Sequence, residues 1–548
     1  MCIRDRSQLN KLAAALNMDP VEIRMKNILR EGSLLSVGTP MPTGVSMPMV
    51  VAECLEVDWK TVHVEQAPLD DRYGRQVVGG SRGTPDGWDD LRIAGAGALY
   101  LLTAAAARKW SVPASQCIAR NGSIVHRPSD RSARYETLLD IAAGLPVPDV
   151  SELKLKRRPG EFSLLGSFVP GVDNPKIVTG QPLFGCDIRI DGMLYAIYEK
   201  CPAYGGKVRS ANIEEIAKLP GVTHAFVVEG TQDLTGLLPG VAIVAKSWWE
   251  ADSARRRLRV TWRSGHTDST VDYDTKAEAL SREAGATLRS DGHVETALES
   301  AKTVVTASYY YPFVSHANME PQNCTALYHE SGAMELWAPS QNPKAGRILI
   351  AETLGIPENS IRVNLTRIGG GFGRRLVNDF MVEAAWIARE IRGAVQLQWS
   401  REDDMRHDFY RPAAWHHFTA GINDRNSMIA FGHHFVTFGK DGRPASGAGI
   451  PSGHYPAGLV PHFRLRRSVI ETNVPTGPWR SPGHSAYCWA YQSFFDEVAL
   501  AAGRDPLAFR LDLLSKSYGK PPLDLTRTRA TLELAASKAG WGRKLDDN

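Results

Sequence analysis

The sequence lacks the cysteine patterns that mark metal-cluster proteins. Its 548 residues include seven cysteines, and no Cys-x-x-Cys pair or Cys/His cluster occurs among them (Cys2, Cys54, Cys117, Cys186, Cys201, Cys324 and Cys488). We therefore expect neither an iron–sulfur cluster nor a zinc knuckle within this chain. An odd, dispersed set of cysteines fits a reduced or disulfide-poor protein.

Long hydrophobic runs and long basic runs are also missing. No apolar run approaches the roughly 20 residues that a membrane-spanning helix needs, so no membrane span is predicted. The N-terminus, residues 1–10, has no hydrophobic stretch behind its charges, and no export signal is visible. The formal net charge is only +4, with short basic clusters at 154–158 and 255–257. Nothing in this pattern indicates a nucleic-acid partner.

The overall composition is that of an ordinary globular protein, with 43% hydrophobic and 23% charged residues. A chain of this length is too long for one hydrophobic core and should form about three or four domains. Alternating and helical patterns occur in separate blocks along the chain. We expect an α+β, multidomain protein.

The most informative stretch runs from Ile361 to Glu390. Residues 361–368 alternate apolar and polar residues and predict a strand, whereas the apolar spacing of 376–390 predicts a helix. The turn between them contains four glycines, one phenylalanine and two arginines (Gly369, Gly370, Gly371, Gly373, Phe372, Arg374 and Arg375). Glycine allows close approach of a ligand, and a helix N-terminus followed by two arginines suits an anion. A plain strand-to-helix turn without a ligand remains the alternative.

Two familiar phosphate-binding motifs do not fit this turn. The dinucleotide fingerprint requires glycine at its first, third and sixth positions, but Arg374 or Leu376 occupies the sixth position in the two registers. A P-loop also fails, because no Gly-Lys-Ser/Thr follows. The turn is therefore predicted to be an anion cradle of another type.

The remaining elements divide the chain into blocks. Before residue 150 we expect helices at 47–57 and 91–110, a strand at 61–67 and a loop at 74–84; a Lys-, Arg- and Pro-rich linker follows at 152–171. The next block is mostly β, with strands at 194–200, 224–230 and 240–246 and a helix at 213–220. After a polar connection at 264–294, the largest block begins with an extended run at 303–313. A helical segment at 8–33 has a partial repeat at 495–514.

Four stretches of the last block combine small or rigid residues with strong donors or acceptors. They are His316–Cys324, Trp337–Gln341, the glycine turn, and Thr476–His484. Such a composition is typical of active-site loops. Taken singly, His316 and Glu320 are better explained as structural partners than as catalysts.

Together, the order and spacing of these stretches resemble the molybdenum hydroxylase family, which contains xanthine dehydrogenase and aldehyde oxidase. The shared motifs include Met-Glu-Pro at 319–321, Gln341, the Gly-Gly-x-Phe-Gly-Arg-Arg turn, Arg-Glu-Asp-Asp-Met at 401–405 and Trp-Arg-Ser at 479–481, with Gly-Gly-Ser-Arg at 79–82. The resemblance covers roughly 500 residues, within the molybdopterin-binding large subunit.

The resemblance implies roles for single residues. Gln341 would hydrogen-bond an oxygen on molybdenum, and Gly370, Gly371, Phe372 and Gly373 would border the metal centre. Arg480 would be the catalytic donor, to the cofactor or to developing negative charge. Arg374 and Arg375 would lie near the pyrophosphate of a cytosine dinucleotide form of molybdenum-molybdopterin. Electrons would leave through a separate subunit that carries 2Fe–2S clusters.

The resemblance also implies domain boundaries and a location. Residues 44–150 would be part of the second molybdopterin-binding domain, 160–263 the family's a/b hammerhead domain, and 295–540 the first molybdopterin-binding domain, with its C-terminal remainder missing. Residues 1–43 would be a helical segment foreign to the family. A periplasmic location is implied by relatives that carry an export signal. The expected substrate is an aldehyde or an N-heterocycle, whose identity the sequence does not specify.

Departures from the family keep other functions open. A Gln-Gly pair that touches the pterin is missing near residue 42, and the family's catalytic glutamate is not found after Arg480, where only Glu497 and Glu533 occur. This chain alone is therefore expected to be inactive, with Glu320 as the first substitute base to test. A flavin or nicotinamide oxidoreductase would need an acid for the ribose, such as Glu402 or Asp403. A non-catalytic scaffold subunit is the third possibility.

Overall fold

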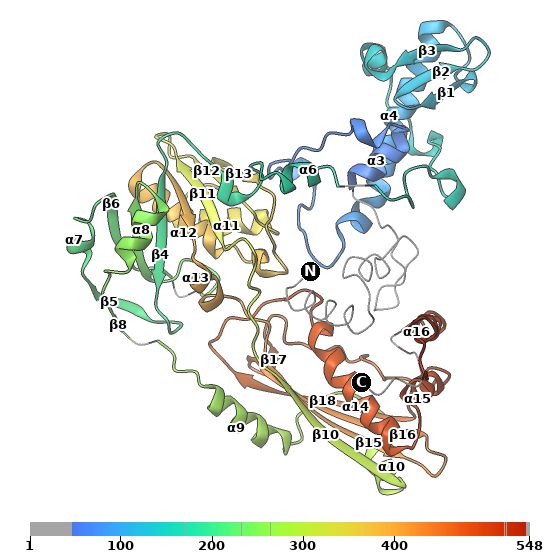
Figure 1. Ribbon diagram of the computed structural model, residues 1–548, viewed down its shortest axis with the longest axis vertical. Helices are drawn as coiled ribbons and strands as arrows, with labels where there is room; N and C mark the ends of the chain where they lie inside the picture. The colour runs from blue at the N-terminus through green and yellow to red at the C-terminus, as the bar shows by residue number, and fades with distance from the viewer. Residues whose placement is uncertain are drawn as a thin grey trace. The chain divides into compact units, whose positions relative to one another are not determined.

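The computed structural model describes residues 47–543, except 170, 232, 264, 520 and 522. The predicted segment 1–43 lies outside the described residues. The chain divides into two compact units (Figure 1): one comprises residues up to 64 with 81–174 and 526–537, the other 65–80 with 175–525 and 538 onward. All four stretches singled out in the sequence belong to the second unit.

The first unit combines helices with a small sheet. Its main elements are α3 (Met47–Leu55), α4 (Gly83–Trp110), the antiparallel strands β1 (Cys117–Arg120), β2 (Ser123–His126) and β3 (Arg131–Arg134), and α5 (Leu139–Ala143). Apolar residues of α4 and of the three strands form its core. The carboxylate of Glu53, which is fully buried, is held by Lys156 and by the backbone N–H groups of residues 163–165.

The second unit is built on a seven-stranded mixed sheet. Its order is β13 (Ile361–Leu365), β12 (Met334–Ala338), β11 (Asn323–Tyr328), β14 (Ala394–Gln398), β4 (Leu194–Lys200), β7 (Gly240–Ala245) and β6 (Val222–Val228). Strand β4 pairs in parallel with β14, so segments 201 residues apart in the sequence share one sheet.

Alternation along the strands gives this sheet two apolar faces. On β4, Ala196 and Tyr198 join the core beneath α11 (Pro343–Leu354) and α12 (Asp379–Ile391), while Ile197 joins the core beneath α7 (Ile213–Ile216) and α8 (Trp248–Arg255). Successive strand residues point to opposite faces. Helices on both faces therefore explain why β7 is buried at every position.

In a second large sheet, neighbouring strands follow the spatial order β10 (Thr303–Tyr311), β15 (Ala414–Ile422), β16 (Met428–Lys440), β18 (His462–Glu471) and β9 (Ala286–Asp291), with β17 (Arg443–Pro444) on β16. Helix α14 (His484–Ala501) places Phe494 and Phe495 against Phe418 and Phe431. Helices α9 (Thr270–Ser281) and α10 (Val294–Glu299) supply residues to other apolar clusters of this sheet.

Shorter elements complete the described chain. Strands β5 (Lys207–Ala211) and β8 (Val260–Arg263) form a two-stranded sheet. The remaining helices are α6 (Asn174–Val178), α13 (Arg401–Arg406), α15 (Pro506–Leu513) and α16 (Leu525–Ala539).

Most predicted elements are present, but the segment 264–294, predicted as a connecting loop with a short helix, contains the twelve-residue helix α9 and the sheet strand β9. The predicted strand at 361–368 is β13, the helix at 376–390 is α12, and the predicted strand at 194–200 is β4. The strand predicted at 61–67 is wrong, since this segment lies outside every sheet and is largely exposed. Alternation of residue types does not make a strand where no neighbouring strand offers a hydrogen-bonding edge.

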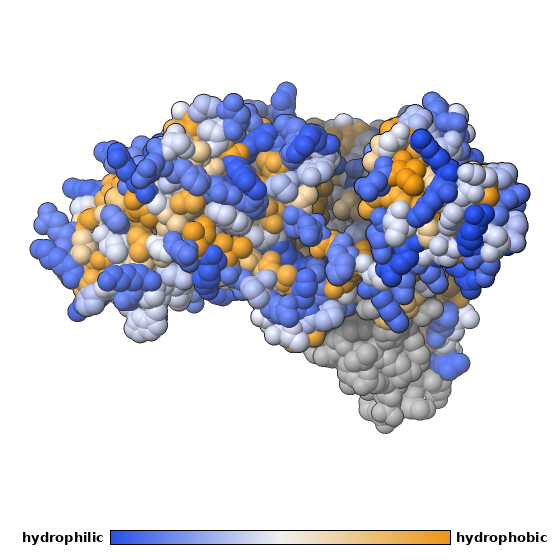
Figure 2. Space-filling model, turned by 90° about the horizontal axis from the view of Figure 1, so that it is seen from above, coloured by the Kyte–Doolittle hydropathy of each residue, from blue (hydrophilic) through white to orange (hydrophobic). Residues whose placement is uncertain are grey.

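On the face shown in Figure 2, hydrophobic residues are interspersed with hydrophilic ones. Among the described residues, none of the helices is both long and apolar enough to cross a membrane. The same residues contain no group of three or more His, Cys, Asp or Glu that could hold a metal ion.

Candidate functional site

The glycine turn connects β13 to α12 through an irregular backbone. Gly370 and Gly373 both have a φ of +110°, and Phe372 between them has a φ of +54°. Glycine adopts such values without a penalty, whereas Phe372 is strained. Two other non-glycine residues with positive φ, Ala317 and Ser481, lie in the first and fourth stretches. Strain of this kind gathers at ligand-binding and catalytic sites.

Gln341 lies against the turn, three residues after β12 ends. Its side-chain oxygen accepts a hydrogen bond from the N–H of Gly373 (3.1 Å), and its amide nitrogen donates to the carbonyl of Val78 (2.8 Å). The backbone N–H of Val78 returns a bond to the Gln341 carbonyl (2.8 Å). A Cβ added at Gly371 would come within 2.5 Å of the Gln341 oxygen. Gly371 therefore makes room for this amide.

Glu320 holds the start and the end of the turn through its contacts with Gly369 and Arg375. One carboxylate oxygen accepts from the N–H of Gly369 (2.8 Å) and from Arg375 (3.2 Å), and the other accepts from Asn323 (2.9 Å) and the N–H of Cys186 (3.2 Å). The carboxylate is almost completely buried. With both oxygens occupied by protein donors, Glu320 is a structural hub and not the substitute base considered from the sequence.

The fourth stretch docks on the turn at two points. The N–H of Arg480 donates to the carbonyl of Phe372 (2.7 Å). The carbonyl of Pro478 lies so close to Gly373 that a Cβ there would overlap it, and it also faces the His316 ring nitrogen Nε2 at 3.2 Å. The Arg480 side chain is exposed. All four stretches chosen from the sequence are thus brought together.

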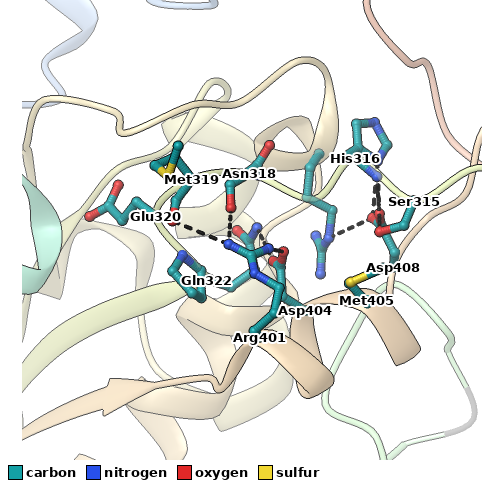
Figure 3. Close-up of polar contacts among 12 residues, drawn as sticks. Ser315, His316, Asn318, Met319, Glu320, Gln322, Arg401, Asp404, Met405 and Asp408 are labelled. Atoms are coloured by element: carbon teal, nitrogen blue, oxygen red, sulfur yellow. Dashed lines mark hydrogen bonds and ion pairs between the residues drawn. The ribbon is translucent and has the colours of Figure 1, made fainter. Parts of the chain in front are cut away.

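Helix α13 anchors the loop that contains His316 and Glu320. Arg401 pairs with Asp404 (2.6 Å) and contacts the carbonyl of Asn318, while Gln322 donates to Asp404 (2.9 Å), as Figure 3 shows. The Arg-Glu-Asp-Asp-Met motif at 401–405 is therefore explained as a support for this loop.

The two arginines of the turn do not agree with their predicted place beside a pyrophosphate. Arg374 is fully buried, with a bidentate ion pair to Asp379 (2.9 and 2.8 Å) and a contact to Asp408 (3.0 Å). Arg375 is equally buried and donates to the carbonyls of Gly370 (2.9 Å) and Glu320 (2.8 Å). Burial lowers the pKa of Arg375 to about 10, against the raising effect of Glu320. Their charges are neutralised inside the protein.

The predicted anion site at the helix N-terminus is also corrected. Helix α12 begins at Asp379, several residues beyond the last glycine, after a 3₁₀ turn at Arg374–Leu376. The carboxylate of Asp379 itself lies in the first helical turn and is paired with Arg374. The helix therefore has its own negative charge where the sequence pattern predicted an external one.

Three consecutive backbone N–H groups of the turn, unlike the two arginines, are not engaged by protein partners among the described residues. In the described part of the chain, we find no acceptor for the N–H groups of Gly370, Gly371 and Phe372. Gly371 is buried, so an unpaired N–H there is costly unless another molecule accepts from it. Consecutive N–H groups in an irregular turn are able to bind an anion or a polarised oxygen.

The carboxylates considered as substitutes are engaged elsewhere. Asp403 is ion-paired with Arg255 and is buried, while Glu402 is exposed. Glu497 accepts from the hydroxyl of Tyr309, and Glu533 pairs with Arg529 on α16 (2.9 Å). Neither arrangement supports a ribose-binding acid at 402–403 or a catalytic base among these glutamates.

Two features of the site were not predicted. The first is Asp408, two residues beyond α13, which accepts from His316 and Arg374. The second is residues 65–80, which belong to the second unit and bring Val78 to Gln341. The Gly-Gly-Ser-Arg motif next to Val78 was a signal for the second feature; Asp408 stands in a sequence without any special pattern.

Comparisons with known proteins agree with this arrangement. A family model described as the molybdopterin cofactor-binding domain matches residues 280–513. The chain is 28% identical to the beta subunit of isoquinoline 1-oxidoreductase from Brevundimonas diminuta, over 92% of this chain and 70% of that protein. It is also 28% identical to a Gluconacetobacter polyoxogenes protein named membrane-bound aldehyde dehydrogenase (pyrroloquinoline-quinone), over 91% of this chain and 68% of that one.

The fold has a counterpart among solved structures. Quinoline 2-oxidoreductase from Pseudomonas putida 86 aligns with a TM-score of 0.54 and 18% identity. The alignment covers 68% of this chain and 54% of the other, so the chain spans about half the length of that structure. At this identity the likeness concerns the fold alone.

Proposed function

We propose that the chain belongs to the molybdenum hydroxylase family and that its glycine turn binds the molybdenum–molybdopterin cofactor. It would act as the cofactor-binding large subunit of an oxidoreductase. The proposed reaction is hydroxylation of an aldehyde or an N-heterocycle with oxygen derived from water. The two electrons would pass to a separate iron–sulfur subunit.

One observation carries the proposal: the unpaired N–H groups of Gly370, Gly371 and Phe372 lie beside Gln341 in the described structure. A cofactor with negatively polarised oxygens supplies the missing acceptors. The turn has no side chain at three of its positions, which lets such a group approach the backbone. These residues therefore fit the cofactor that the family implies.

The chain's own residues would bind and orient this group. Gln341 has one amide N–H beyond the bond to Val78, and its oxygen is held by Gly373, so the free N–H has a defined direction. The backbone N–H of Arg480 holds this residue to the turn, and its guanidinium is exposed. The guanidinium would donate to the cofactor or to developing negative charge. The bound group would supply the redox chemistry.

Finer assignments extend the proposal. We assign residues 160–263 to the a/b hammerhead domain, 295–540 to the first molybdopterin-binding domain, and 44–150 to part of the second. The iron–sulfur partner is supported by relatives named as subunits. The cytosine dinucleotide form and a periplasmic location are inferred from the resemblance alone. No residue is assigned to the cytosine dinucleotide, because Arg374 and Arg375 are buried in ion pairs.

The test is the cofactor content of protein purified from a host that makes molybdopterin. We expect molybdenum and pterin in about equal amounts with protein, and release of CMP on hydrolysis if the cofactor is the dinucleotide. Gln341→Leu should lower both contents, while Gly393→Ala should not, because a Cβ at this position after α12 meets only Ile391 O, at 3.9 Å. Wild-type protein without molybdenum and pterin would contradict the proposal.

The same sample separates the alternatives. Pyrroloquinoline quinone, named in one relative, would be found by its own absorbance and by release on denaturation. Bound flavin or nicotinamide would indicate the oxidoreductase weighed from the sequence. Protein that contains none of these groups would support a scaffold subunit.

A further inference from the structure

One edge of the six-stranded sheet is a nine-residue strand that pairs on one side only. Strand β10 is the outermost strand of this sheet (Figure 1) and pairs with β15 along its whole length, in a register without any shift. In the described part of the chain, no other strand pairs with the second side of β10, and no backbone hydrogen bond joins that side to another segment. Its outward N–H and C=O groups are therefore open to pairing with a further strand.

The other three terminal strands of the two large sheets each have a feature that discourages further pairing. Strand β6 has a register shift between Val222 and His224, and the five-residue strand β13 carries the charge of Arg362. Strand β9 has a register shift against β18 and contains Arg289 and Asp291. Strand β10 has no charged residue, no proline and no register shift. Bulges, charges and short length are the usual protection of sheet edges, and β10 lacks all three.

One face of β10 exposes apolar side chains beside this open edge. Val304 and Tyr310 are 47% and 42% exposed, and Thr306 and Ser308 between them are exposed as well. The alternate residues point to the opposite face, where Tyr309 packs against α14. The edge therefore combines open backbone groups with large apolar side chains whose burial would be favourable.

The side chains of β10 are complementary to those of a second β10 in antiparallel pairing. When two copies pair about Ala307, Val304 lies opposite Tyr310 of the second copy, and Thr306 lies opposite Ser308 of the second copy. A β-branched residue opposite an aromatic residue, and Thr opposite Ser, are favourable cross-strand pairs. Two-fold symmetry makes each pair occur twice. Because β10 has no charged residue, no like charges meet.

We propose that β10 is a dimerisation edge, through which two copies of this chain join their six-stranded sheets into one continuous sheet. The two-fold axis passes beside Ala307, and the same surface of both copies forms the interface. A second copy is the partner because an identical uncharged strand matches β10 residue by residue in this register. The dimer is a property of the chain and forms with or without a bound cofactor.

The first test is the mass of the purified full-length chain as its concentration changes. Sedimentation equilibrium from the sub-micromolar to the high micromolar range should show a monomer passing into a species of twice its mass. Hydrogen exchange followed by mass spectrometry locates the interface. We expect the outward amides of β10 to exchange about 10-fold more slowly in the dimer than in the monomer, because they gain hydrogen-bond acceptors. Amides of β6 should exchange equally in both.

Two double variants test the register. Val304→Lys with Tyr310→Lys places like charges opposite each other across the proposed pairing, and should raise the Kd of the dimer about 10-fold. Val304→Lys with Tyr310→Glu places opposite charges there, so its Kd should be about 10-fold lower than that of the first variant at low salt. Val227→Lys is the control, because Val227 is an exposed valine on β6, and it should dimerise as the wild type.

Each outcome bears on the proposal. A wild-type chain that stays monomeric at every concentration would overturn it, as would a dimer whose β10 amides exchange as fast as in the monomer. Equal Kd values for the two double variants would also overturn it. A complex of one chain with a different polypeptide that protects the β10 amides would assign this edge to that partner instead. The wild-type measurements need no variant, so they decide the proposal even if a double variant does not fold.

Discussion

At the scale of single residues, the site depends on positions where a side chain has no room. Gly371 is the clearest case, because its missing Cβ gives space to the Gln341 amide (2.5 Å). The sequence had suggested that this space belonged to the ligand. The structure shows that Gln341, a residue predicted to contact the cofactor, occupies it first.

We therefore predict that Gly371→Ala displaces Gln341 and lowers cofactor content at least 10-fold, with little change in the rest of the fold. The change in Tm should stay within a few degrees, because the strain is confined to a loop. Molybdenum and pterin are measured on purified protein, with Gly393→Ala as the control, since a Cβ there meets only Ile391 O, at 3.9 Å. Normal cofactor content in Gly371→Ala would show that the position of Gln341 is not needed for cofactor binding.

A second residue-scale prediction concerns Arg480. Its side chain is exposed, and in the described part of the chain no ion pair involves it. Arg480→Lys retains the charge but loses the planar fork of donors. We expect the free energy of unfolding to change by less than about 0.5 kcal/mol, whereas cofactor content or the activity of the assembled enzyme falls. Full activity of Arg480→Lys would contradict the proposed donor role of the Arg480 guanidinium.

At the scale of elements, a buried ion pair joins the seven-stranded sheet to the helix after the glycine turn. Lys200 on β4 lies 2.7 Å from Glu383 on α12, and the Trp399 indole N–H donates to the other Glu383 oxygen (2.7 Å). The ammonium also lies 3.3 Å from the centre of the Trp399 ring. Since α12 begins a few residues after the turn, this pair fixes the sheet against the helix that supports the site.

We predict that Glu383→Gln destabilises the protein by about 3–5 kcal/mol, because it leaves a buried ammonium without a counter-charge. The double variant Lys200→Met with Glu383→Leu should recover much of the loss, since two apolar groups of similar size need no partner. Urea unfolding gives the values. Glu390→Gln, near the exposed end of the same helix, is the control and should cost little. Equal losses for Glu383→Gln and Glu390→Gln would contradict this account.

At the scale of the whole molecule, several histidines are buried without charge. His416 and His433 stack against each other and form a hydrogen-bonded chain with Tyr311 and Tyr491. Burial lowers the pKa of both rings well below the usual value. The same cause lowers the pKa of His434, on the same strand as His433, to about 4.

These lowered pKa values predict sensitivity to acid. Below the unfolded pKa of about 6.5, the unfolded chain binds protons that the folded chain excludes, so stability falls as pH falls. From pH 7.5 to pH 5, His434 alone should account for about 2 kcal/mol. Thermal unfolding should show Tm lower by several degrees at pH 5, and His434→Gln should reduce the difference. His329→Gln is the control. A Tm that rises on acidification would contradict the prediction.

Local pattern was enough for much of the fold and for part of the site. The strand β13, the helix α12 and the glycine turn follow from residue periodicity and from glycine, which act within a few residues. The place of Gln341 and Arg480 beside that turn was expected from the family resemblance, whereas the contacts of Glu320 with the turn were not predicted. The strand predicted at 61–67 is absent because a strand needs a neighbouring strand, which local sequence pattern does not supply.

By itself, the sequence determined most of the elements and the α+β class and indicated the family, because these depend on local spacing and on motifs in order. Only the tertiary structure decided what the charged residues do. Arg374 and Arg375 looked like ligands for an anion, but Asp379, Asp408 and Glu320 neutralise them, and three backbone N–H groups remain unpaired instead. The reason is physical: a charge takes the nearest partner in space, and folding brings Glu320 and Asp408 to arginines some 30 to 55 residues away.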